Sequence, residues 1–323
     1  MSARQSLLVG DIGGTNCRFA LAGDDLRPTD AGVEPGDAHP DLESAIGAYL
    51  EKSGARADVA AFAVASPIVA GRPTRLTNRR DWVVDPNAIA RRFGFARVIV
   101  MNDFVAQAAS LPRLGPDELV PIGDAAPAEG LKVAVGPGTG LGVAALAPDG
   151  TGWRPLPGEG GHIELAAIDE REWAALGVVR RALGRVEAEA VLSGPGMVRL
   201  HVALAEIDGA AAPEKTSAEI VALAENGDAR ALETTDRFVA MFARFCGDLA
   251  LLYAAEGGVY VCGGIAPRML KLIDATAFRS AFEAKGSYDA MLRNIATSIV
   301  IAPAPGLLGC AAEAWRRLAA GEQ

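Results

Sequence analysis

Apolar and polar positions form alternating blocks along the N-terminal part of the chain. Residues 6–22 form an apolar run, a glycine turn and a second run of alternating apolar character, a pattern that predicts a β-hairpin. Residues 59–65 and 97–101 predict further strands, whereas 42–50 and 87–93 have helical spacing. Strands that alternate with helices predict an α/β sheet with helices on its faces, and ligands usually bind at the ends of such strands.

The strand, glycine turn and strand pattern recurs at residues 132–146, which indicates an internal duplication. The first copy carries Asp11 where its strand meets the turn, and the second has Gly136 there. The first copy is therefore suited to a metal ion and the second to phosphate. Between the two copies, residues 112–130 are rich in proline, glycine and aspartate, and we expect them to connect two lobes.

The C-terminal half begins with a long amphipathic pattern at residues 234–256, which predicts a helix with a core-facing stripe. The stripe consists of Phe238, Met241, Phe242, Phe245, Leu249 and Leu252. The sequence VYVCGGIAPRML then predicts a buried strand, a turn at Gly263 and Gly264, and a helix that begins at Pro267. The last segment predicts a proline-stiffened link followed by an amphipathic helix.

Length and composition indicate how many lobes the protein has and which classes of partner it can bind. A chain of 323 residues is longer than a domain with one compact core usually is, so we expect two lobes around a shared cleft. Half of the residues are apolar and 22% are charged, which is typical of a well-packed protein. The net charge of −9 comes without any basic stripe, so nucleic acid is not an expected partner.

Cysteine usage and the N-terminus indicate the compartment. The four cysteines have no CxxC spacing and lie mostly in apolar runs, which favours small buried side chains over a disulfide framework or a zinc site. The N-terminus enters a strand without a basic segment followed by an apolar stretch, and 18 uncharged apolar residues never run together. We therefore expect a cytoplasmic protein that is not membrane-bound.

Three glycine turns are candidate phosphate-binding elements. In the first, Gly13 and Gly14 would let the backbone approach phosphate oxygens, Thr15 and Asn16 can donate hydrogen bonds, and Asp11 would face a metal ion. For a single glycine pair, a tight hairpin is the better interpretation. A second turn at Gly138, Thr139 and Gly140 and a third at Gly263 and Gly264 favour one nucleotide site, although Walker and GxGxxG spacings are absent.

Polar side chains that could serve an attacking hydroxyl follow. Asn102 and Asp103 stand directly after a predicted strand, where an acid can act as a base, although a helix cap before residues 104–110 is the more frequent role and the two can coexist. Glu159, His162 and Glu189 are suited to sugar hydroxyls. The alternative for His162 is a metal ligand, but no cluster of Cys or His residues accompanies it. The alternative for Glu189 is a position on a solvated helix face.

In order along the chain stand VGDIGGTN, LTN, MNDF, GPGTGLG, PGEGGH, AEAVLSGPG, CGGIAPR and PGLLG. This ordered set covers nearly the whole chain and resembles the bacterial glucokinase family. The resemblance implies the actin-like ATPase fold, related to ribonuclease H, of the hexokinase superfamily. It implies a smaller α/β domain at residues 1–112 and 303–323 and a larger α+β domain at residues 113–302, around a cleft.

The resemblance also implies an activity, in which ATP and Mg²⁺ serve to phosphorylate the 6-hydroxyl of D-glucose, giving glucose 6-phosphate and ADP. The enzyme would be a cytoplasmic homodimer of glycolysis. Asp103 matches the general base, and with it Asn102, Glu159, His162 and Glu189 match the sugar ligands. The nucleotide side is matched by Asp11 (the metal residue, through water), Gly13, Gly14, Thr15, Asn16, Gly138, Thr139, Gly140, Gly263 and Gly264.

The chain departs from the pattern of related families at two places, and three other functions are alternatives to glucose phosphorylation. Relatives of the repressor/ORF/kinase (ROK) group carry a cysteine-rich zinc motif just after the residue equivalent to His162, and the segment IELAAIDEREW that follows His162 has no cysteine, so zinc is not expected. Pro137 before Gly138 is stiffer than the residue expected there. One alternative function is a kinase for N-acetylglucosamine, mannose or fructose. A second is a non-catalytic sugar sensor, but the first strand at Leu7 leaves no room for the DNA-binding helices of such regulators. A third is a chaperone or filament ATPase of the same fold, which would need longer insertions.

Overall fold

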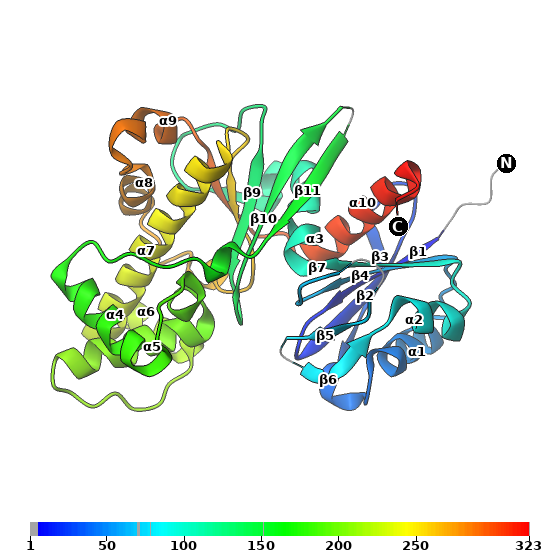
Figure 1. Ribbon diagram of the computed structural model, residues 1–323, viewed down its shortest axis with the longest axis horizontal. Helices are drawn as coiled ribbons and strands as arrows, with labels where there is room; N and C mark the ends of the chain where they lie inside the picture. Colours follow the sequence, from blue (N-terminus) through cyan, green and yellow to red (C-terminus); the bar gives the residue numbers. More distant parts are fainter. Residues whose placement is uncertain (1–5, 70–71, 78, 151, 323) are drawn as a thin grey trace. The chain divides into compact units, whose positions relative to one another are not determined.

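A computed structural model describes residues 6–69, 72–77, 79–150 and 152–322 (Figure 1). Asn78 of the LTN motif lies outside these residues. The chain packs into two compact units. Unit 1 comprises Met1–Leu114, Asp149–Pro157 and Ala302–Gln323, and unit 2 comprises Gly115–Pro148 and Gly158–Ile301.

The elements of unit 1 alternate between strands and helices, as predicted. They are β1 (Leu7–Ile12), β2 (Asn16–Ala22), β3 (Pro28–Pro35), η1 (Gly36–Ala38), α1 (Leu42–Ser53), β4 (Val59–Val64), β5 (Thr74–Leu76), β6 (Arg79–Val84), α2 (Pro86–Phe93), β7 (Arg97–Asn102), α3 (Asp103–Ser110), η2 (Leu111–Arg113) and α10 (Pro305–Ala320). Helix α2 shows why the boundaries fall where they do. Asp85 caps it by accepting hydrogen bonds from two backbone amides, Pro86 opens it, and Gly94 ends it at φ +73°.

Five strands form the main sheet of unit 1, in the order β3-β2-β1-β4-β7. Strands β1, β4 and β7 run parallel, and β2 and β3 extend the sheet as an antiparallel meander. Alternate β1 residues face opposite sides, so Leu7 and Val9 pack with α3 and α10, whereas Leu8 and Ile12 pack with α1. Figure 1 shows these two helical layers on either face of the sheet.

The remaining elements, listed in chain order, build the second sheet and its helices. They are η3 (Pro116–Glu118), β8 (Leu119–Pro121), β9 (Lys132–Pro137), β10 (Leu141–Asp149), β11 (Gly152–Gly158), η4 (Gly160–His162), α4 (Glu170–Leu183), η5 (Ala188–Ala190), α5 (Gly194–Ile207), α6 (Ser217–Glu225), α7 (Ala229–Tyr253), β12 (Val259–Val261), η6 (Ala266–Met269), α8 (Ala275–Glu283), η7 (Gly286–Tyr288), α9 (Asp289–Arg293) and β13 (Thr297–Val300).

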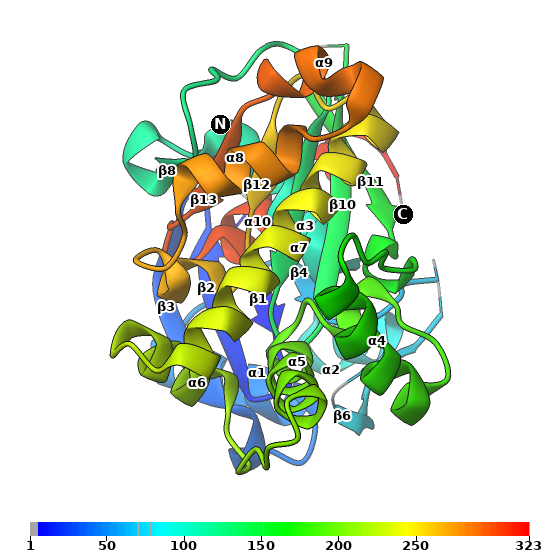
Figure 2. The same cartoon turned by 90° about the vertical axis from the view of Figure 1, so that its left-hand side faces the viewer.

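The second sheet has the order β11-β10-β9-β12-β13-β8. Its centre repeats the arrangement of the first sheet, with a hairpin (β9 and β10) whose first strand pairs in parallel with β12, and β12 with β13. This repeated topology agrees with the duplication inferred from the two hairpin patterns. Figure 2 shows α7 across one face of this sheet, and α7 side chains enter the same core as β9 and β12.

Three local predictions need correction. Leu252 does not share the buried stripe of α7, because 70% of its surface is exposed near the helix end. Residues 112–130 are more than a connection, since β8 within them pairs antiparallel with β13. The segment at Pro267 is the short 3₁₀ helix η6 and not an α-helix.

Candidate active site

The first group of candidate residues lies at the carboxyl ends of the parallel strands of unit 1. The register aligns Asp11 of β1 with Ala63 of β4 and Met101 of β7, so Asp11 and Asn102 end strands at the same edge of the sheet. One strand separates them, which places the two strand axes roughly 10 Å apart. This is the edge at which parallel α/β sheets bind ligands.

Asn102 and Asp103 share the start of helix α3. Asn102 is the N-cap, because its Oδ1 accepts from the Phe104 amide at 2.9 Å while its Nδ2 donates to the Ser66 carbonyl oxygen at 3.2 Å. Asp103 is the first helical residue, and its Oδ1 accepts from the same amide at 3.0 Å. The cap that the sequence assigned to Asp103 therefore belongs chiefly to its neighbour, and Asp103 is held at the strand end on a fixed helical turn.

The first glycine turn is a tight hairpin tip next to Asp11. The Gly13 amide donates to the Asn16 carbonyl oxygen at 3.0 Å, and the Gly36 amide donates to the Thr15 carbonyl oxygen at 2.8 Å. Thr15 is exposed at the tip, and Gly14 is partly exposed beside it. The glycine pair thus serves the hairpin geometry and also leaves the tip of the turn accessible to a ligand.

Asp11 is the acid of this turn, and its surroundings are unusual for a carboxylate. Burial raises its pKa, and the Arg18 guanidinium 3.7 Å away lowers it by a smaller amount. The first turn of α10 lies against it, since a Cβ atom on Gly306 would come within 3.2 Å of Asp11 Oδ2. A carboxylate oxygen at the end of a strand, a quarter exposed, fits the donor type that Mg²⁺ takes from proteins.

In unit 2 the second and third glycine turns lie together. Strands β9 and β12 run parallel and end side by side, and a Cβ on Gly136 would lie 2.1 Å from the Cys262 carbonyl oxygen. Gly263 adopts φ +87°, and its Cβ would lie 2.9 Å from the Pro137 carbonyl oxygen. Larger residues would force the two turns apart, so glycine is required by this close approach.

Helix α5 begins at the second turn. The Gly194 amide donates to the Gly138 carbonyl oxygen at 2.8 Å, and the Ser193 hydroxyl caps the helix by accepting from the Gly196 amide at 3.0 Å. The positive end of the α5 dipole therefore faces the turn that carries Thr139, which favours a negatively charged ligand there.

Glu189 holds the other side of the same turn. It lies in η5, and its Oε2 accepts from the Leu141 amide at 2.7 Å, directly after Gly140. A Cβ on Gly140 would lie 2.4 Å from that oxygen, so a larger residue there would displace the carboxylate from its present position. The alternative of a solvated helix face is wrong for Glu189, which is half-buried and bonded to the backbone beside the second glycine turn.

Glu159 and His162 extend from a loop that lies directly on β10. A Cβ on Gly161 would approach the Leu141 carbonyl oxygen to 2.0 Å, which explains the glycine pair between the two side chains. His162 Nε2 is 3.9 Å from Glu159 Oε2, and both side chains are about half exposed. The structure thus brings Glu159 and Glu189 each close to His162.

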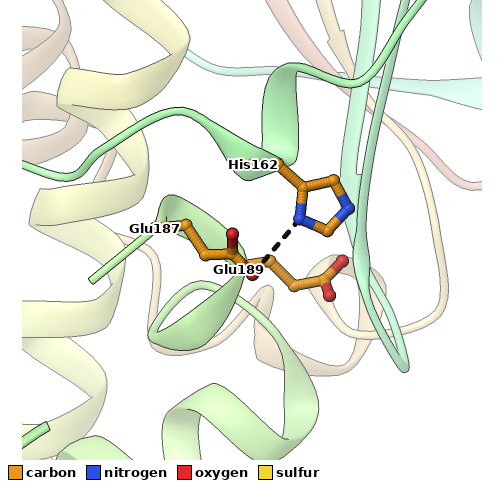
Figure 3. A group of neighbouring side chains, drawn as sticks. All are labelled: His162, Glu187 and Glu189. Carbon is orange, nitrogen blue, oxygen red and sulfur yellow. Dashed lines mark ion pairs between the residues drawn. The ribbon is translucent and has the colours of Figure 1, made fainter. Parts of the chain in front are cut away.

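One residue of this group was missed by the sequence interpretation. Glu187 Oε1 lies 3.2 Å from His162 Nδ1, and Figure 3 shows the Glu187 carboxylate directed at the imidazole with Glu189 beside the pair. One ring nitrogen of His162 and one carboxylate oxygen of each glutamate lie within 4.8 Å of one another. The side chains that accompany the histidine are therefore carboxylates and not cysteines. The only signal in the sequence was the closeness of Glu187 to Glu189, since Glu187 is the N-cap of the short helix η5 that contains Glu189.

A pocket of about 360 Å³ in unit 2 opens beside this group. Its polar lining includes Thr139, Glu187, Glu189, Ser193 and two arginines, Arg185 and Arg199. Glu189 and Thr139 of the second glycine turn therefore line one hollow.

A family model described as Glucokinase matches residues 8–317. The chain belongs to the glucokinase family. It is 41% identical over 311 residues to the curated glucokinase of Caulobacter vibrioides, covering 94% of this chain and 93% of the relative. It is 42% identical over 307 residues to the glucokinase of Chromohalobacter salexigens, covering 94% and 95%. The resemblance inferred from the motifs is confirmed.

Solved structures of glucokinases have the same fold. The crystal structure of a glucokinase from an Antarctic psychrotroph is 32% identical, has a TM-score of 0.86 and covers 97% of this chain and all of its own. A glucokinase from Balamuthia mandrillaris, solved in complex with glucose, is 18% identical with a TM-score of 0.81, covers 98% of this chain and 94% of its own, and supports the fold alone. The predicted two-lobed actin-like kinase fold is confirmed.

The cysteines of this glucokinase-family chain take no part in the candidate site. All four are buried free thiols, and burial raises the pKa of Cys17 to about 11 and those of Cys262 and Cys310 to about 12. The expectation of small buried side chains is confirmed. In the part of the chain that the structure describes, no helix is both long enough and apolar enough to cross a bilayer.

Proposed function

We propose that this member of the glucokinase family is an ATP-dependent hexose kinase that phosphorylates the 6-hydroxyl of D-glucose, giving glucose 6-phosphate and ADP. The observation that carries the proposal is the placement of Asn102 and Asp103 at the sheet edge where β1 presents Asp11. Identity of about 40% to curated glucokinases over nearly the whole chain supports the choice of glucose.

Asp103 is the proposed general base. Its carboxylate stands on the first turn of α3, where the Phe104 amide donates to Oδ1 and orients the group at the strand end. Asn102 is restrained by hydrogen bonds at both ends of its amide, so its second N–H can be offered to the sugar in a fixed direction. The two side chains would hold the attacking hydroxyl in line with the γ-phosphate.

Residues of unit 2 serve the same reaction in this proposal. Glu159, His162 and Glu189 bind hydroxyls on the rest of the ring, with carboxylate oxygens and an imidazole nitrogen as acceptors. The turn Gly138, Thr139 and Gly140 binds phosphate, and Gly263 and Gly264 lie on the adenosine side. Because the two turns abut and Glu189 is bonded to the amide after Gly140, sugar and phosphate contacts are coupled through short paths.

The first hairpin provides the cation side. Asp11 would hold Mg²⁺ through water, and Gly13, Gly14, Thr15 and Asn16 would approach the phosphates at the hairpin tip. When bound, the cation neutralises charge on the transferring phosphoryl group. The oxygen-donor chemistry of the Asp11 carboxylate, its partial exposure and its place at the strand end support this assignment.

Replacing Asp11 with asparagine is expected to raise thermal stability of the ligand-free protein at neutral pH and to lower kcat by about 10²-fold or more. Burial raises the Asp11 pKa, so the folded state binds this proton more tightly than the unfolded state, and the ionised carboxylate destabilises the fold above its folded pKa. The Tm gain should shrink as pH falls and wild-type Asp11 becomes protonated. Melting curves across pH, paired with turnover, check this. A lower Tm at neutral pH would contradict it.

Glucose is expected to exceed N-acetylglucosamine, mannose and fructose in kcat/KM by at least about tenfold, because a missing or displaced hydroxyl leaves hydrogen-bonding groups of the site unpaired. A coupled ADP-release assay over these hexoses, with and without Mg²⁺, makes the comparison. A higher kcat/KM for another hexose would assign the protein to that sugar. Sugar binding without ADP release from any hexose would indicate the sensor alternative.

Three further properties are proposed on the family resemblance. The enzyme acts in the cytoplasm, serves glycolysis and forms a homodimer.

A further inference from the structure

We propose that Glu187 is a positioning residue that holds the His162 imidazole by its Nδ1 proton and so presents bare Nε2 to the sugar. The inference rests on the proposed function, because it assigns His162 to the sugar side. Glu187 itself would touch no substrate. It would act through the histidine, by selecting which of the two neutral tautomers the ring adopts.

Backbone pairing places Glu187 beside His162, so the contact between the two side chains is not a chance approach at the surface. Residues 163–165 and 186–188 pair as two short extended segments, with an antiparallel bridge between Glu164 and Glu187. The Ala188 amide donates to the Ile163 carbonyl oxygen at 2.8 Å, and the Leu165 amide donates to the Val186 carbonyl oxygen at 3.1 Å. Glu187 is thereby fixed in register opposite Glu164, two residues after His162.

Side-chain contacts then direct the carboxylate at the ring. Glu187 Oε1 is 3.2 Å from His162 Nδ1, whereas the competing carboxylate, Glu159 Oε2, is 3.9 Å from Nε2. Arg185 supports the arrangement from the other side, since its Nη2 donates to the His162 carbonyl oxygen at 2.7 Å and lies 4.0 Å from Glu187 Oε2. Glu187 is the less exposed of the two acids, at 28% against 59%.

The choice of tautomer decides what the site offers a sugar. A neutral imidazole has one donor nitrogen and one acceptor nitrogen. With the proton on Nδ1, Nε2 and Glu159 Oε2 form a pair of acceptors that can receive the protons of two neighbouring hydroxyls. With the proton on Nε2, the ring would donate toward Glu159, and the pair would lose one acceptor. Glu187 therefore favours the form that binds a vicinal diol.

The direct test is the tautomer of His162 in the ligand-free protein. The chain has three histidines, His39, His162 and His201, so long-range ¹H–¹⁵N spectra can be assigned with single variants. At about pH 8.5 or above, where imidazoles are generally neutral, His162 is expected to show a protonated Nδ1 and a bare Nε2. In Glu187→Ala the signals are expected to move to the Nε2-protonated form that free imidazoles prefer.

Kinetics provide the second readout. Glu187→Ala is expected to raise the KM for glucose about tenfold, the cost of one lost hydrogen bond to a charged group, with kcat and the KM for ATP within about twofold of wild type. Glu187→Gln keeps an acceptor for Nδ1 and should recover most of the loss. Glu164→Ala is the matched control, because it removes an equal charge from the bridge partner of Glu187 and leaves His162 and its contacts in place.

The outcomes separate the inference from the function beneath it. An Nδ1-protonated ring that persists in Glu187→Ala overturns the positioning role, as does an equal KM rise in Glu164→Ala. If His162→Ala leaves the KM for glucose unchanged, the sugar role of the histidine fails, whatever the spectra show. If chelator treatment of wild type followed by Mg²⁺ addition raises the glucose KM, and Zn²⁺ restores it, the His162, Glu187 and Glu189 group is a cation site and the inference is overturned.

Discussion

Replacing Asp103 with alanine is expected to lower kcat for glucose phosphorylation by about 10²- to 10⁴-fold, the contribution of a positioned general base. The KM for glucose should change much less, because Asn102 and the acids of unit 2 still bind the ring. Initial rates over a range of glucose concentrations at saturating ATP separate the two parameters.

The structure provides the control that this experiment needs. Helix α3 keeps its cap when Asp103 is changed, since Asn102 Oδ1 accepts from the Phe104 amide independently. Asp103→Asn preserves shape and an acceptor for the same amide but removes the base, so it should be as slow as the alanine variant while melting like wild type. Turnover close to wild type in either variant would remove Asp103 from its role.

Replacing Gly309 with alanine is expected to destabilise the protein by about 3 kcal/mol, since overpacking a close contact costs about this amount. A Cβ on Gly309 of α10 would lie 1.6 Å from the Ala106 carbonyl oxygen of α3, a backbone atom that cannot move without the helix. The corresponding fall in Tm is roughly 6–12 °C. Because α3 begins at Asp103, activity of the folded fraction should fall as well.

Gly47 is the matched control for this substitution. It lies in helix α1 of the same unit, and the nearest atom to its Cβ would be a Phe93 ring carbon at 3.8 Å. Gly47→Ala is expected to stabilise the protein by about 0.5–1 kcal/mol through helix propensity. Equal melting curves for the two variants would contradict the close packing of α3 on α10.

Local patterns predicted much of the fold because the corresponding contacts are close in sequence. The hairpins at 6–22 and 132–146 and the capped helix α2 depend on turn residues and periodicity, both readable from the chain. Leu252 was wrong for a related reason. Periodicity places it on the stripe of α7, but it stands one residue before the helix ends at Tyr253, where 70% of its surface is exposed.

Contacts between distant segments could not be predicted in the same way. The approach of Gly306 to Asp11 depends on how α10 returns to the sheet. The contact of Glu187 with His162 depends on pairing across a helix and two loops. Asn102 competes with Asp103 for the cap, and only the backbone geometry decides between adjacent residues. The assignment of the site residues came from the resemblance of the motifs to a known family wherever the local sequence pattern did not decide it.

The most direct test of glucose phosphorylation is the product itself. Purified protein, ATP, Mg²⁺ and glucose should yield one glucose 6-phosphate for each ADP, with glucose 6-phosphate measured by glucose-6-phosphate dehydrogenase and ADP by a coupled assay. Asp103→Asn at equal concentration should yield neither at a comparable rate. ADP release without glucose 6-phosphate, or no ADP release at all, would contradict the assignment.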